Sequence, residues 1–116
     1  MCHALVIEDD WLIADHIICL IERAGATSIA QADTQDAAVE QAHHRRPDII
    51  VSDVKLLEGT GPAAVQRILS HYGDLPVIFV TGTPEDCIPF APPMVILNKP
   101  VNDAVVVDTF RRLAPR

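Results

Sequence analysis

Five polar side chains stand out in the sequence because each follows a short run of apolar residues. Glu8 and Asp9 come after the first run, and Asp53 comes one serine after the central run. Thr81 and Lys99 follow the last two runs. A short apolar run bounded by turn residues is typical of a buried strand, so these side chains are expected at strand ends. The runs cover residues 4–7, 49–51, 77–80 and 94–97.

These residue types together are suited to phosphoryl transfer. Carboxylates that share a crevice repel one another and have raised pKa values unless a cation joins them. Mg²⁺ fits such a site, because it takes a few carboxylates, water and phosphoryl oxygens as ligands. Asp53 would then attack phosphorus in line to give an aspartyl phosphate. Mg²⁺, the Thr81 hydroxyl and the Lys99 ammonium group would stabilise charge on the equatorial oxygens.

Each of these residues also has a purely structural interpretation. Asp53 could begin a turn or cap a helix, Thr81 could be a turn residue, and Lys99 could be an ordinary solvated lysine. Asp10 is expected to cap the first helix instead of binding a metal ion. Trp11 is either a lid over the crevice or a partly buried helix residue, and the sequence leaves both open.

Helical patterns separate the apolar runs. In the first, Ile13, Ile17 and Ile21 share a face, and Gly25 ends the helix. Cys19 is expected to fill the core. Further helices are expected near residues 33–46, 62–72 and 102–113, and a weak strand near residues 28–30 is expected towards a sheet edge. Between residues 83 and 93, prolines limit any helix to roughly one or two turns.

The alternation of strands and helices predicts an α/β fold. We expect a doubly wound, five-stranded parallel sheet with helices on both faces and a short or irregular fourth helix. Right-handed crossovers favour the flavodoxin-like strand order 2-1-3-4-5, which places the first and third strands side by side. Residues 1–116 are interpreted as a single domain.

The composition of the chain argues against several classes of function. The net charge of −7 argues against direct binding of nucleic acid, which depends on clustered lysine and arginine. No apolar run approaches the roughly 20 residues that span a membrane, and no secretory signal is visible. The three cysteines are odd in number and lack metal-binding spacing, which favours a reduced, cytoplasmic compartment.

The order and spacing of these motifs resemble the receiver domains of bacterial two-component response regulators, the CheY-like family. The matching motifs are Glu8-Asp9, Asp53, Gly61 eight residues later, Thr81-Gly82 and Lys99-Pro100. The resemblance implies that Asp53 accepts a phosphoryl group from a sensor histidine kinase or a histidine phosphotransfer protein. It implies that Asp9, Asp53 and the backbone carbonyl of Lys55 bind Mg²⁺, while Glu8 acts largely through water. It also makes Lys99-Pro100 a candidate cis peptide.

The chain departs from the family pattern at three places. Ile96 stands where the family usually has an aromatic switch residue, and Leu57 stands where proline is common. The segment from Thr81 to Lys99 is short and rich in proline, which would reduce the helix that normally helps to form the output surface. We therefore expect that phosphorylation is retained while the signal leaves by a nonstandard surface. Lys55 is expected to alter the lifetime of the acyl phosphate.

The sequence is compatible with three classes of function. The leading one is a signalling switch, which is not an enzyme on an external substrate although it catalyses its own phosphorylation and dephosphorylation. The alternative is a pseudo-receiver that works as a protein-interaction module without phosphorylation. A Mg²⁺-dependent phosphohydrolase is disfavoured, because the Asp-x-Asp pattern of that class is absent. The sequence leaves open the downstream output partner, homodimer formation, and whether the domain stands alone or belongs to a longer regulator.

Overall fold

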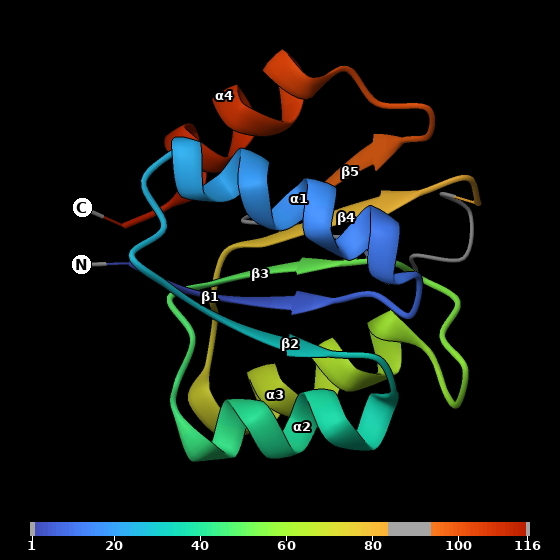
Figure 1. The fold of residues 1–116 in the computed structure, drawn as a ribbon. Helices are drawn as coiled ribbons and strands as arrows, with labels where there is room; N and C mark the ends of the chain where they lie inside the picture. The colour runs from blue at the N-terminus through green and yellow to red at the C-terminus, as the bar shows by residue number, and fades with distance from the viewer. Residues whose placement is uncertain (1, 84–93, 116) are drawn as a thin grey trace.

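The computed structural model describes residues 2–83 and 94–115. Its strands form one parallel sheet in the order β2-β1-β3-β4-β5, as the alternating pattern predicted (Figure 1). The weak second strand lies at an edge, also as predicted. The strands are β1 (His3–Ile7), β2 (Ser28–Ala32), β3 (Ile49–Ser52), β4 (Val77–Thr81) and β5 (Met94–Asn98). The helices are α1 (Trp11–Arg23), α2 (Gln35–His44), α3 (Gly61–Tyr72) and α4 (Asp103–Leu113).

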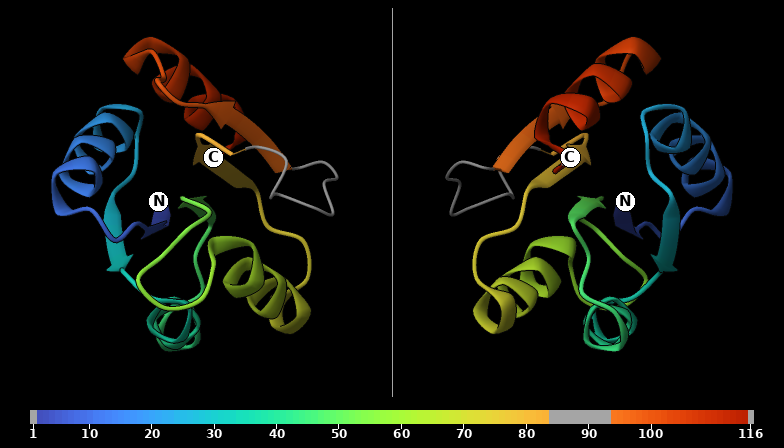
Figure 2. Two further views of the ribbon diagram at one scale, coloured as in Figure 1. Left: turned by 90° about the vertical axis from the view of Figure 1, so that its right-hand side faces the viewer. Right: turned by 90° about the vertical axis from the view of Figure 1, so that its left-hand side faces the viewer.

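The helices cover both faces of the sheet. In Figure 1, α1 and α4 lie above the sheet and α2 and α3 lie below it, and the views in Figure 2 agree. Successive strand residues point to opposite faces, so Leu5 packs with the α2–α3 layer and Val6 packs with the α1–α4 layer. The largest buried side chains are Phe79 in the first layer and Phe110 in the second. The fold is therefore a doubly wound sheet between two apolar cores.

Side-chain caps fix where the helices begin. The Asp10 carboxylate accepts hydrogen bonds from the backbone N–H groups of Leu12 and Ile13, so the expected cap of α1 is present. Thr34 and Thr60 cap α2 and α3 through their hydroxyl groups. The first two helices begin soon after β1 and β2 end, whereas a longer loop separates β3 from α3.

Two expectations for α1 had different outcomes. Ile17 and Ile21 are buried as predicted, whereas Cys19 is exposed, so its expected place in the core was wrong. The reason is geometric: residues two apart on a helix do not share a face. Trp11 is 76% exposed, so it is not partly buried in the helix packing.

The expected short fourth helix lies outside the described residues, within 84–93. In the described ranges, none of the helices has the length and apolar character needed to span a membrane.

Candidate functional site

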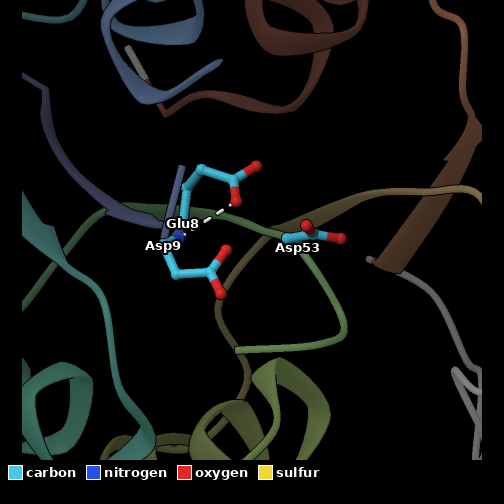
Figure 3. A group of neighbouring side chains, drawn as sticks. All are labelled: Glu8, Asp9 and Asp53. Carbon is cyan, nitrogen blue, oxygen red and sulfur yellow. Dashed lines mark hydrogen bonds between the residues drawn. The ribbon is translucent and has the colours of Figure 1, made fainter. Parts of the chain in front are cut away.

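The acidic residues converge at the carboxyl ends of β1 and β3. These strands are neighbours, with Ile7 opposite Ser52, and the Asp53 N–H donates to the Ile7 carbonyl at 2.9 Å. Glu8, Asp9 and Asp53 each offer a carboxylate oxygen within 4.8 Å of the others (Figure 3). In residues 2–83 and 94–115, no other group of three metal-binding side chains meets that spacing. The strand order thus joins two sequence motifs that lie far apart in the chain.

Glu8 is the most deeply buried of the three acids. This residue is 1% exposed, and its Oε2 accepts hydrogen bonds from the N–H groups of Asp9 and Asp10 at 3.0 and 3.3 Å. Oε1 has no hydrogen-bond partner among the described residues. Burial, followed by the negative charge of Asp53, raises the pKa of Glu8 to about 7. This carboxylate is therefore short of positive charge in its present surroundings.

Lys99 supplies the nearest positive charge. Its Nζ lies 3.2 Å from Asp53 Oδ2 and 3.8 Å from Glu8 Oε1. The backbone N–H of Lys99 donates to the Thr81 carbonyl at 2.9 Å, which continues the pairing of β5 with β4 beyond the strand end. The Lys99-Pro100 peptide bond is cis, as the resemblance suggested. One ammonium group thus faces two carboxylates from different strands.

Two other residues predicted for the site, Thr81 and Lys55, contact groups outside the three acids. Thr81 is buried at the end of β4, and its hydroxyl accepts a hydrogen bond from the Thr83 N–H at 2.9 Å. Within the described residues this hydroxyl makes no hydrogen bond to Asp53. Lys55 is exposed in the β3–α3 loop, where it forms a β-bridge with Thr60. The functional roles of Thr81 and of the Lys55 carbonyl remain predictions.

Close packing around Asp53 holds its backbone and carboxylate in place. The Val54 N–H donates to Asp53 Oδ1 at 2.7 Å, and the Ser52 hydroxyl donates to the Asp53 carbonyl at 2.7 Å. A Cβ atom on Gly61 would lie 1.8 Å from that carbonyl oxygen and 2.3 Å from Ser52 Oγ. The family spacing singled out Gly61, but only the structure gives the physical reason. Ser52 was not predicted, although a serine in an apolar strand was a usable signal.

The loop after Asp53 is tied to the start of α2. The Gln35 N–H donates to the Glu58 carbonyl at 3.0 Å, and the Thr60 N–H donates to Gln35 Oε1 at 3.3 Å. Gly59 has a φ of 78°, and a Cβ there would lie 2.3 Å from the same Gln35 oxygen. We call these contacts the Gln35 clamp. No sequence signal indicated it, because contacts across 25 residues follow from tertiary packing.

The donor set fits a hard divalent cation such as Mg²⁺. Glu8, Asp9 and Asp53 provide oxygen ligands only, which Mg²⁺ prefers to nitrogen or sulfur. The unpartnered Glu8 oxygen and the raised pKa of Glu8 both indicate a site that lacks positive charge. An acidic crevice with one lysine can therefore accept a metal ion and an anionic group together.

The fold and this crevice define the class of protein. The chain matches the response regulator receiver domain family over residues 4–106 and therefore belongs to that family. The phyllosphere-induced regulator PhyR of Methylorubrum extorquens is 40% identical over 83 residues, which is 70% of this chain and 31% of PhyR. The response regulator GacA of Pseudomonas viridiflava is 30% identical over 90 residues, which is 77% of this chain and 42% of GacA. The chain thus spans less than half the length of these relatives.

Solved structures agree with this assignment. The receiver domain of Erythrobacter litoralis PhyR has a TM-score of 0.85 at 30% identity, covering 97% of this chain and 88% of that domain. PhyR from Brucella abortus has a TM-score of 0.83 at 30% identity, covering 97% of this chain and 47% of PhyR. A PhyR mutant from Bartonella quintana, described as an anti-anti-sigma factor, has a TM-score of 0.78 at 31% identity, covering 95% of this chain and 48% of that protein.

Proposed function

We propose that this receiver domain is a phosphoacceptor in a two-component phosphorelay. Asp53 takes a phosphoryl group from a phosphohistidine of a sensor histidine kinase or a histidine phosphotransfer protein, in a Mg²⁺-dependent reaction in the cytoplasm. Phosphorylation of Asp53 then changes the affinity of the domain for an output partner. The observation that carries this proposal is the position of Lys99 Nζ, 3.2 Å from Asp53 Oδ2 and 3.8 Å from Glu8 Oε1, which has no hydrogen-bond partner among the described residues.

The residues of the crevice have distinct parts in this reaction. Asp53 is held at Oδ1 by the Val54 N–H, which fixes the rotation of the carboxylate before it attacks phosphorus. The P–N bond to the donor histidine breaks as the O–P bond forms, and the imidazole nitrogen keeps the electron pair. Lys99 then pairs with a phosphoryl oxygen instead of the bare carboxylate. The Thr81 hydroxyl has to turn from Thr83 to donate to the phosphoryl group.

Glu8, Asp9 and Asp53 would hold the metal ion. When bound, Mg²⁺ would offset negative charge on the phosphoryl oxygens during transfer. Glu8 accepts two backbone hydrogen bonds through Oε2. These bonds orient the carboxylate and leave Oε1 available as a metal ligand. We further propose that the Lys55 carbonyl completes the protein ligands, as in the family pattern. The domain is not an enzyme on an external substrate in this proposal.

Phosphorylation with a small donor tests the proposal. With acetyl phosphate and Mg²⁺, Phos-tag electrophoresis should show a retarded band that is absent from Asp53→Asn and absent when EDTA is present. Asp48→Asn is a matched control outside the crevice, and it should keep the retarded band. Absence of the band in the folded wild-type protein would reject the phosphoacceptor proposal. Hydrolysis of a generic phosphate ester would indicate a phosphohydrolase instead.

A pseudo-receiver is the second candidate function. Ile96, in place of an aromatic switch residue, is half-buried in β5 and packs against the α2–α3 core layer. A change of rotamer by this aliphatic side chain would alter the surface less than the movement of an aromatic ring, so phosphorylation would have a smaller effect on partner binding. Partner binding that is equal for the wild type and Asp53→Asn after both are treated with acetyl phosphate and Mg²⁺ would support this candidate. Because one similar PhyR is described as an anti-anti-sigma factor, regulators of sigma factors are reasonable first partners to try.

A further inference from the structure

A second cleft lies between the first turns of α1 and the β2–α2 connection. It has a volume of about 540 Å³. The starts of α1 and α2 both lie at the end of the sheet to which the strand arrows point (Figure 1). We call it the Trp11 cleft. Its lining residues are Trp11, Asp15, Gln31, Ala32, Asp33 and Ala37.

The walls of the Trp11 cleft combine an indole with carboxylates. Trp11 is 76% exposed, so it contributes little to the apolar core. Asp15 lies one helical turn further along α1 on the same face as Trp11, and Asp33 lies across the cleft from them. In residues 2–83 and 94–115, neither Asp15 nor Asp33 forms a salt bridge. An exposed indole face next to unpaired carboxylates is the chemistry that binds a guanidinium or ammonium group.

We propose that the Trp11 cleft is a docking site for a partner protein that inserts an arginine side chain from a basic segment. Charge complementarity carries this choice: none of the described residues that line the cleft is a lysine, arginine or histidine, and the chain has a net charge of −7. Arginine suits the cleft better than lysine, because its planar guanidinium group stacks on an indole while it donates to a carboxylate. Tryptophan and arginine also dominate the binding energy of many protein interfaces.

The Gln35 clamp connects this cleft to the loop after Asp53. Gln35 lies between Asp33 and Ala37 of the cleft wall, and it contacts Glu58 and Thr60 of the loop. A movement of that loop therefore reaches the cleft wall through main-chain and side-chain hydrogen bonds. We infer that the state of Asp53 alters the affinity of the cleft, a part of the inference that rests on the proposed function.

Trp11 provides its own assay, because it is the only tryptophan in the chain. The probe is an acetylated and amidated Gly-Arg-Gly peptide, and the same peptide with citrulline is its neutral control. The arginine peptide should give a saturable change in Trp11 fluorescence, with an affinity about tenfold higher than that of the citrulline peptide. The double variant Asp15→Asn/Asp33→Asn should lose this preference. Asp108→Asn, which removes a charge from the exposed face of α4, should keep it.

Other outcomes overturn the docking inference. Equal affinities for the arginine and citrulline peptides would show that the cleft does not select a cation. An unchanged preference in the Asn double variant, shown to be folded by circular dichroism, would place the binding site elsewhere. Self-association of the wild type, detected by sedimentation and lost in the double variant, would make a second copy of this chain the occupant.

Coupling to Asp53 is tested separately. Beryllofluoride with Mg²⁺, compared with Mg²⁺ alone, should change the affinity for the arginine peptide by about threefold in the wild type and not in Gln35→Ala. If Asp53 is phosphorylated in the Phos-tag assay while this affinity stays constant, the coupling is wrong and the proposed function stands. If Asp53 is not phosphorylated but the arginine peptide still binds selectively, the proposed function fails and the docking site stands.

Discussion

Replacing Glu8 by glutamine is expected to stabilise the metal-free domain. Glu8 is 1% exposed, one of its oxygens has no hydrogen-bond partner among the described residues, and its pKa is raised to about 7. Glutamine keeps the volume and one acceptor oxygen for the N–H groups of Asp9 and Asp10. It removes the buried negative charge that faces Asp53. Lys99 still pairs with Asp53 after the substitution, so no new uncompensated charge is left behind.

The size of the effect follows from the pKa shift. The ordinary pKa of this carboxyl is 4.5, and in the folded domain it is about 7. At 1.36 kcal/mol for each pKa unit, this difference corresponds to at most roughly 3 kcal/mol of free energy of unfolding. The gain comes from the lost charge alone, because the amide NH2 group of glutamine takes the position of Oε1, which has no hydrogen-bond partner among the described residues.

The pH dependence has a definite sign. At pH well below 4.5 the carboxyl is protonated in both the folded and the unfolded states, so its burial carries no charge penalty. Between 4.5 and about 7 the folded state binds more protons, and this group lowers the free energy of unfolding as the pH rises. Above pH about 7, the buried charge of Glu8 lowers the free energy of unfolding by its full amount. The advantage of Glu8→Gln over the wild type should therefore grow through this interval and then level off.

Urea unfolding in EDTA buffer measures this difference. Circular dichroism curves at about pH 5, 6, 7 and 8 should give a stability gain that rises towards about 2–3 kcal/mol at the alkaline end. Glu22→Gln removes an exposed carboxylate from α1 and serves as the matched control, with little dependence on pH. A gain for Glu8→Gln that is the same at every pH, or a loss of stability at alkaline pH, would refute the reasoning.

Other substitutions probe the packing around the crevice and the phosphoryl lifetime. Gly61→Ala should lower the free energy of unfolding by about 1–3 kcal/mol and slow phosphorylation, because its Cβ would lie 1.8 Å from the Asp53 carbonyl oxygen. Gly82→Ala, where a Cβ meets no atom of the described residues within 4 Å, should have little effect on urea unfolding. Lys55→Ala should change the half-life of phosphorylated protein, measured by loss of the Phos-tag band, and an unchanged half-life contradicts this. Phe110→Ala, at a 0% exposed core position, should cost about 3–5 kcal/mol in urea unfolding, and a cost near that of a surface substitution would contradict the assigned core.

The sequence alone determined the fold and the chemical character of the site. Apolar runs that alternate with helical patterns specify a parallel α/β sheet, since each element must bury its apolar side against another. The acids at Glu8, Asp9 and Asp53 were recognisable because each follows a strand, and the strand order then brings them together. Lys99 was predicted for the same reason.

Tertiary structure alone decided how these groups are held and what lies beside them. The unpartnered oxygen of Glu8 and the turning of the Thr81 hydroxyl towards Thr83 depend on local packing that no periodic pattern encodes. The Gln35 clamp joins residues that are 25 positions apart, and the Trp11 cleft needs a helix and a distant loop to face each other. Secondary structure follows from interactions between near neighbours in the chain, whereas these contacts exist only once separate elements have packed together.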